Sequence, residues 1–301
     1  MDGASMIYNL RNLLNETSGS SFLDTRTSYE FLWEAAREFV ARTNSLKSTQ
    51  TVTTVADTGE YSLTPDFLKL YLHDDNDNFV IKYNDGTNDY FIPYKHYDEI
   101  IVDNETTSIS IPSYFTIIPD DTKDTRVSGT TTSAGAASGG EATLTDTGAD
   151  FSDVEAGDYV HNTTDGSAGV VLSKTSITVL VCALFNGTDD DWTSGDAYVI
   201  QPQGRHKIKL SPPPSTSSET ITLYYIKSPD PVFSDYGVYQ IHRDSLPVLI
   251  KYAAWLYKYR DREMDTGDVL HQQWEKQLRR VNATQNSSTN RSRFGVSFKK
   301  R

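Results

Sequence analysis

The sequence predicts an α+β fold in which a helical bundle forms the core, accompanied by antiparallel strands and an inserted small all-β module. Three patterns in the 301-residue chain lead to this prediction. Apolar residues recur at helical spacing in one N-terminal and two C-terminal segments. Between these segments the apolar period changes to two, which is typical of strands. A Gly/Ser/Thr-rich stretch then leads into an acidic region that has strand patterns of its own.

A C-terminal helical hairpin is predicted from Asp244 to Val281. The segment Met264–Gly267 interrupts the apolar pattern, and Asp265 or Thr266 could cap the second helix. Helices joined by so short a turn usually fold back as an antiparallel pair. The first apolar stripe comprises Leu246, Leu249, Ile250, Ala253, Leu256 and Tyr257, and the second comprises Leu270, Trp274, Leu278 and Val281.

An N-terminal helix is predicted from Ser28 to Leu46, after a short helix at Met6–Leu14. Thr27 and Glu30 have the spacing of a capping box, in which each side chain binds a backbone amide of the other residue. The apolar face of this helix is expected to cover the hairpin, since neither can bury its stripe alone. The shared core is then expected to contain Trp33, Phe39, Leu249, Leu256 and Trp274.

Alternating patterns predict strands on both sides of the acidic region. Clusters of Asp, Asn, Gly and Pro separate these strands, and such residues are typical of turns. The expected strands are Thr51–Val55, Glu60–Leu63, Leu68–Leu72, Phe79–Tyr83, Tyr90–Tyr94, Glu99–Val102, Tyr114–Ile118, Lys207–Leu210 and Thr220–Ile226.

The region 125–205 is predicted to be an inserted β module between the two parts of the main fold, residues 1–124 and 206–285. Its entry, Ser128–Gly140, consists almost entirely of Gly, Ser, Thr and Ala, so we expect it to pack no core. Residues 286–301 form a basic tail. The module's expected strands are Glu141–Leu144, Asp158–His161, Gly169–Leu172, Ile177–Leu184 and Ala197–Ile200.

Charge is unevenly distributed along the chain, whose formal net charge is −13. Residues 129–204 contain eleven acidic side chains and a single base, Lys174. From Arg279 onward there are seven bases and no acid. This asymmetry indicates that the parts of the chain have different neighbours.

No motif of catalysis, cofactor binding or metal binding stands out, so we expect no enzyme, no cofactor and no metal. The six histidines are scattered, and Cys182 lies in an apolar run where a buried thiol is expected. Asp74–Asn78 lacks the glycine of a calcium loop, and Asp189–Asp191 is typical of a charged loop. A hydrolase that uses a pair of carboxylates is an alternative that the sequence does not exclude, because acidic residues are abundant. No signal peptide or membrane span is expected, which favours folding in a reducing cytosol.

Four residues share one face of the first hairpin helix: Lys251, Trp255, Lys258 and Arg262. This face could contact a neighbouring subunit or the phosphates of a DNA channel, because Lys and Arg neutralise phosphate. An ordinary solvated face with one partly buried Trp is the alternative.

The order of several segments along the chain, and their residue patterns, resemble those of tailed-bacteriophage head-to-tail connector (adaptor) proteins. The similar segments are the helix Ser28–Leu46 with Val52–Val55, then Gly59–Phe67, and Thr220–Pro231 with the hairpin after it. The resemblance implies a ring, usually of twelve copies, that lies under the portal in the virion neck. Such a ring extends the channel for double-stranded DNA without sequence-specific binding, and tail, nozzle or fibre proteins dock on it. It also implies synthesis in a bacterial host cytoplasm. The acidic insertion departs from the simpler family pattern.

The C-terminal tail, Asn282–Arg301, is expected to be disordered in the free chain and to become ordered on the portal protein. Alternating apolar residues could add a strand to a partner's sheet. A basic end that only increases solubility is the alternative. The expected portal-contacting residues are Arg291, Arg293, Phe294, Val296, Phe298, Lys299, Lys300 and Arg301.

Other functions remain open at this stage. Trp192, Tyr159 and Tyr198 could stack on a sugar, which would make the chain a glycan- or receptor-binding tail component. A nozzle or tail-completion protein and a virion-associated enzyme are further alternatives.

Overall fold

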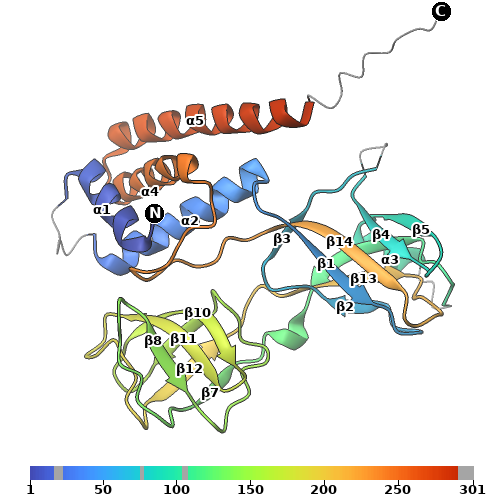
Figure 1. Ribbon diagram of the computed structural model, residues 1–301, viewed down its shortest axis with the longest axis horizontal. Helices are drawn as coiled ribbons and strands as arrows, with labels where there is room; N and C mark the ends of the chain where they lie inside the picture. Colours follow the sequence, from blue (N-terminus) through green and yellow to red (C-terminus); the bar gives the residue numbers. More distant parts are fainter. Residues whose placement is uncertain (17–22, 75–77, 104–107, 291–301) are drawn as a thin grey trace, which may run out of the picture. The chain divides into compact units, whose positions relative to one another are not determined.

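The computed structural model describes residues 1–16, 23–74, 78–103 and 108–290. The chain divides into two compact units, which we call the helical unit (Met1–Ser45 with Asp235–Arg301) and the β unit (Leu46–Ser234). The described residues form fourteen strands and five α-helices (Figure 1). The protein is therefore mostly β, and the predicted fold class, with a helical bundle as its core, is wrong. The three sheets are antiparallel, and they hold most of the chain's regular structure outside the helical unit.

The first two helices begin at aspartate caps. Asp2 accepts the Ser5 amide at 2.9 Å and starts α1 (Gly3–Leu14). Asp24 accepts the Thr27 amide at 2.6 Å and starts α2 (Thr25–Thr43), three residues earlier than predicted. The predicted capping box is wrong because Asp24 satisfies the first turn, while the Glu30 carboxylate pairs with Arg26.

The C-terminal hairpin consists of α4 (Leu246–Arg260) and α5 (Met264–Asn290), which pack against each other. Pro247 lies in the first turn of α4, where a missing amide hydrogen costs nothing. Arg262 takes a positive φ of 63° in the connecting turn. The helix α5 starts at Met264, one residue before the earlier of the two predicted caps.

The packing of α2 on this hairpin is confirmed, since α2 contacts α4 closely and α5 more sparsely. Phe39, Leu249 and Trp274 are buried in the helical unit, as predicted. Trp33 and Leu256 are only half-buried, so the predicted five-residue core is correct for three of its members. The helix α1 also packs on α2 and α4.

In the β unit, β14 is the central strand of a five-stranded sheet. It pairs with β1 along its whole length, and with β4 and β3 on its other side, while β5 extends the sheet beyond β4. The strands are β1 (Lys47–Thr53), β3 (Phe67–Leu70), β4 (Val80–Asn84), β5 (Asp89–Pro93) and β14 (Thr220–Lys227).

A three-stranded sheet contributes to the same hydrophobic core, which includes Phe115, Ile208 and Leu223. Its order is β2-β13-β6. The helix α3 (Tyr97–Asp103) packs on β6 and replaces the strand predicted at Glu99–Val102. Asp98 and Glu99 lie in the first turn of α3, where acidic side chains favour a helix. The strands are β2 (Glu60–Ser62), β6 (Tyr114–Pro119) and β13 (His206–Ser211).

The acidic region forms a six-stranded sheet, which we call the β module, in the order β7-β12-β9-β10-β11-β8. Its core contains Trp192, Tyr198, Phe151 and Cys182, all essentially buried. In the sequence the module lies between β6 and β13, which pair with each other at Pro119 and His206. Its strands are β7 (Val127–Thr130), β8 (Ala142–Thr145), β9 (Tyr159–Asn162), β10 (Ala168–Ser176), β11 (Val179–Phe185) and β12 (Ala197–Gln201).

The Gly/Ser/Thr/Ala stretch belongs to the β module, and, as predicted, it contributes no residue to the module's hydrophobic core. It supplies most of β7, and Ser133 then bridges to Thr145, the last residue of β8, so the two edges of the sheet meet. Small residues are required there: a Cβ on Gly135 would lie only 1.9 Å from the Thr143 carbonyl oxygen.

Candidate functional site

The four residues predicted to share a face of α4 lie mainly in the contact between α4 and α5. The Trp255 ring lies 4.6 Å from the His271 ring of α5 and 5.0 Å from that of Tyr252. Lys258 pairs with Glu263 at 2.8 Å, and its side chain is only 14% exposed. Lys251 is half-buried and Arg262 is exposed. Only one of the predicted residues is therefore fully presented to solvent.

An aromatic cluster holds the hairpin to α2. Tyr252 lies 4.8 Å from Trp274, and the Arg42 guanidinium of α2 lies over the Trp274 ring at 5.4 Å. Arg42 also forms an ion pair with Glu275 of α5. Burial and the nearby carboxylates of α2 raise the pKa of Tyr252 to about 12. This cluster fixes α5 on the bundle, and the side of α5 opposite Trp274 faces outward.

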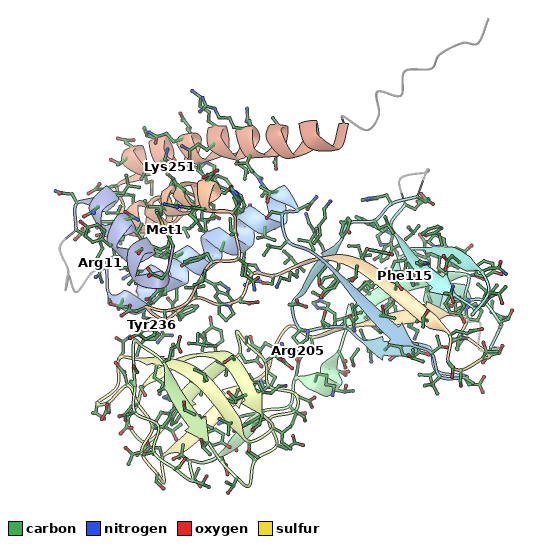
Figure 2. All side chains as sticks on the ribbon, viewed as in Figure 1. Met1, Arg11, Phe115, Arg205, Tyr236 and Lys251 are labelled. Carbon is green, nitrogen blue, oxygen red and sulfur yellow. The ribbon has the colours of Figure 1, made fainter. Side chains whose placement is uncertain are left out.

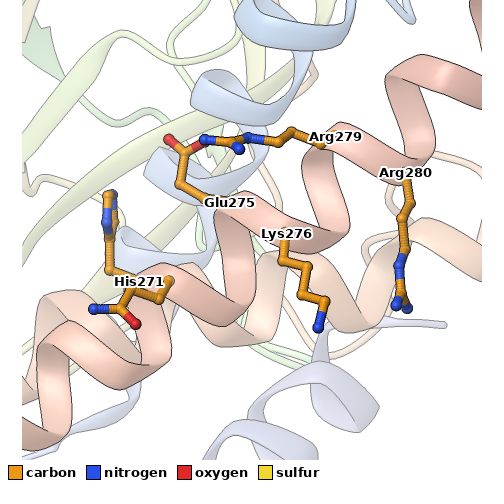
Figure 3. A pocket seen from close by; sticks show the side chains of 6 residues that line it. His271, Glu275, Lys276, Arg279 and Arg280 are labelled. Carbon is orange, nitrogen blue, oxygen red and sulfur yellow. The ribbon is translucent and has the colours of Figure 1, made fainter.

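The outward side of α5 carries a hollow of about 490 Å³ (Figure 3). Its side chains follow one another at helical spacing, so a single helix supplies the whole lining. Because Arg42 already neutralises Glu275, the remaining charges of the hollow are cationic. We call Lys276, Arg279 and Arg280 the basic face. The lining comprises His271, Gln272, Glu275, Lys276, Arg279 and Arg280.

Sequence reasoning did not single out the basic face, although a signal for it was present. The apolar stripe of α5 passes through Trp274 and Leu278, so positions 276, 279 and 280 lie outside that stripe. Arg279 and Arg280 are the first two of the seven bases that follow from position 279 onward.

The predicted tail begins in helical structure. The helix α5 continues to Asn290, so the expectation of disorder from Asn282 onward is wrong for the first nine residues. The Asn282 side-chain amide donates to the Arg42 carbonyl at 3.4 Å. The expected portal-contacting residues, Arg291 to Arg301, lie outside the described residues.

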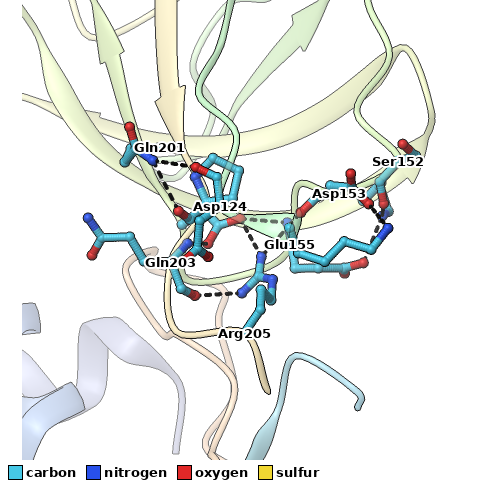
Figure 4. Close-up of polar contacts among 11 residues, drawn as sticks. Asp124, Ser152, Asp153, Glu155, Gln201, Gln203 and Arg205 are labelled. Atoms are coloured by element: carbon cyan, nitrogen blue, oxygen red, sulfur yellow. Dashed lines mark hydrogen bonds and ion pairs between the residues drawn. The ribbon is translucent and has the colours of Figure 1, made fainter. Parts of the chain in front are cut away.

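At one end of the β module, which we call the root, ion pairs bind the module to adjoining segments (Figure 4). Arg205 donates to the Asp158 carboxylate at 2.7 Å, and the two side chains are 8% and 3% exposed. Arg205 also donates to the carbonyls of Gln203 and Asp153. Lys123 pairs with Asp153 at 2.6 Å. Burial raises the pKa of Asp158, although Arg205 and two backbone amides act in the opposite direction.

At the other end of the module, four carboxylates gather around two loops, and we call Asp165, Asp189, Asp190 and Asp191 the acidic tip. Strand β9 begins directly after Asp158 and ends at Asn162, near Asp165. Strand β11 ends at Phe185, shortly before Asp189. The Thr188 amide donates to the Asp165 carbonyl at 3.0 Å, so the two loops touch. Burial and the charges of Asp189 and Asp165 raise the pKa of Asp191.

The three aromatic residues suggested for sugar stacking do not form one exposed platform. Trp192 and Tyr198 are each 1% exposed and meet edge to face in the module core, with ring centroids 6.4 Å apart. Tyr159 is 50% exposed. A stacking site would need at least one of the two buried rings at the surface.

Among the described residues, no group of three or more His, Cys, Asp or Glu could hold a metal ion. Within the same part of the chain, no helix is both long and apolar enough to cross a membrane. Burial raises the pKa of the Cys182 thiol, which keeps it protonated. The Asp74–Asn78 loop lies partly outside the described residues.

Comparison with protein-family models gives no match for this chain, and no curated protein matches it.

Proposed function

We propose that this chain is a structural virion protein that forms a ring between the capsid portal and the tail. The helical hairpin α4–α5 carries the proposal. Aromatic contacts and an ion pair hold α5 against α4 and α2. The opposite side of α5 is not buried and presents cationic side chains to solvent. An exposed helix face of this kind suits contact with another subunit.

The likeness to connector proteins supports the same function. The helix α2, β1 with the segment after it, and β14 with the hairpin are the elements that carry that likeness, and they span both units. A ring needs heterologous contacts, in which one patch of a subunit meets a different patch of the next. The chain offers chemically different surfaces, because one end of the β module is acidic and one face of α5 is basic.

The net charge of the chain is compatible with the channel role. A formal charge of −13 per subunit gives little counterion-release attraction, so double-stranded DNA would slide past and not stick. In this proposal the portal lies above the ring, and tail, nozzle or fibre proteins lie below it.

Mass photometry of the purified full-length chain tests the assembly. One copy has a mass of 33.7 kDa, so a twelve-copy ring is expected near 400 kDa, alone or after addition of the portal protein of the same virus. A chain that stays monomeric in both conditions would contradict the proposal.

A further inference from the structure

The charges of the β module are sorted between its root and its acidic tip. Two bases pair with acids at the root, Arg205 with Asp158 and Lys123 with Asp153, while Arg126, directly before β7, is exposed. Lys174, the single base within residues 129–204, pairs with Glu155 at 2.7 Å. In the described part of the chain, no ion pair reaches the four carboxylates of the acidic tip.

The acidic tip therefore carries a net charge that the module itself does not neutralise. Asp189 and Asp190 are exposed, and their carboxylates accept bonds from the loop backbone, from the Asp190 amide at 2.9 Å and the Gly187 amide at 3.3 Å. Asp165 is already bound to the Asn162 amide at 2.9 Å, which holds its loop in place. Like charges this close repel one another, so a cationic partner would stabilise the loops.

The basic face of α5 has the complementary charge. Lys276 and Arg279 are exposed, and within the described residues neither forms an ion pair. Glu275, the acid nearest to them in sequence, is already paired with Arg42. The whole face lies on one helix that is fixed to the bundle, so its charges are held in a constant arrangement.

We propose that the basic face of one copy binds the acidic tip of the next copy, so that the β module joins neighbouring subunits. The inference rests on the proposed ring and adds the surface that closes it. A second copy is favoured over DNA because one chain supplies both surfaces in equal number, and because the acidic tip needs a cation that DNA cannot provide. Such a contact is heterologous, as a ring requires.

Charge reversal tests the contact. The face-reversed variant carries Lys276→Glu and Arg279→Glu, and the tip-reversed variant carries Asp189→Lys and Asp190→Lys. Each variant alone should need at least about tenfold more protein to assemble, as measured by mass photometry near physiological salt. The matched control, Arg126→Glu with Arg243→Glu, changes charge equally at exposed positions elsewhere and should assemble like the wild type.

Mixing the two variants in equal amounts should restore assembly, because they can alternate around a ring with an even number of copies. Basic faces then meet acidic tips, and the reversed, acidic faces meet the reversed, basic tips. All substituted side chains are exposed, so circular dichroism should show unchanged folding.

Three results would overturn the inference. If the wild type assembles and both variants assemble equally well, the contact is wrong and the ring proposal stands. If one chain with all four reversals assembles but the mixture does not, the two surfaces pair within a copy. If the face-reversed variant assembles normally but no longer binds a 30-base-pair duplex that the wild type binds, the basic face serves DNA. A wild type that never assembles would instead refute the ring itself.

Discussion

Replacing Arg205 with Ala should destabilise the root of the β module. Asp158 accepts from Arg205 at 2.7 Å and from the Glu155 amide at 2.8 Å, and its side chain is 3% exposed. Without the guanidinium, a nearly buried carboxylate keeps only backbone donors. Removing one partner of a buried ion pair typically costs about 3–5 kcal/mol. We expect a loss of this size in the free energy of opening the root.

The loss should shrink at low pH. Burial already raises the pKa of Asp158 in the folded chain, and Arg205 opposes that rise. Removing Arg205 therefore raises this pKa further. A carboxyl whose folded-state pKa exceeds its unfolded value of about 3.9 binds a proton more readily when folded, so stability rises as pH falls through that window. The variant and the wild type should thus converge as the buffer is made more acidic.

Hydrogen exchange read by mass spectrometry is the suitable assay, because it resolves the module from the rest of the chain. Peptides covering β9 and β12 should exchange faster in Arg205→Ala. Lys174→Ala is the matched control: it breaks a more exposed pair with Glu155, which is worth only about 0–1 kcal/mol. Arg205→Met combined with Asp158→Asn should recover much of the protection. Equal exchange in Arg205→Ala and Lys174→Ala at neutral pH would refute the reasoning.

Two further predictions concern the two units. Leu249→Ala should cost the helical unit about 2–5 kcal/mol, because Leu249 is 0% exposed, and Leu256→Ala should cost clearly less, because Leu256 is half-buried. Urea unfolding followed by helical circular dichroism measures both, and equal losses would count against this packing. Replacing residues 125–205 with a short Gly/Ser linker should leave the rest folded, because Pro119 and His206 already face each other in neighbouring strands. Aggregation of that variant would show that the module is integral to the core.

The helices with long apolar stripes were predictable from sequence. The stripes of α2, α4 and α5 each run for several turns, and a period of 3.6 over that length is distinctive. The short helix α3 was not, because Ile100, Ile101 and Val102 form a brief β-branched run that fits a strand equally well. Its acidic first turn and its contact with β6 decide the outcome.

The sequence pattern underestimates the share of β-sheet in the fold for a physical reason. The sheets depend on pairings between distant segments, such as Thr53 in β1 with Thr220 in β14. Strands of three to nine residues carry little periodic signal individually. The Gly/Ser/Thr stretch carries no strand pattern, yet β7 extends into it, and Gly135 allows close approach to the Thr143 backbone.

The candidate surfaces were partly visible in the sequence. The concentration of acids between residues 129 and 204 and the bases of α5 can be counted directly. The arrangement of these charges in space cannot be counted from the sequence. Arg205 and Asp158 are 47 positions apart, and they meet only because the sheet folds. Only the structure shows that, among the residues it describes, no cation pairs with the acidic tip.

Density in a map of the assembled virus particle tests the central claim most directly. The account predicts a closed ring of this chain between portal and tail, with α5 and the β module of adjacent copies in contact and an open channel at the centre. Density for this chain only in a fibre, in the capsid shell or in the tail tip would contradict it.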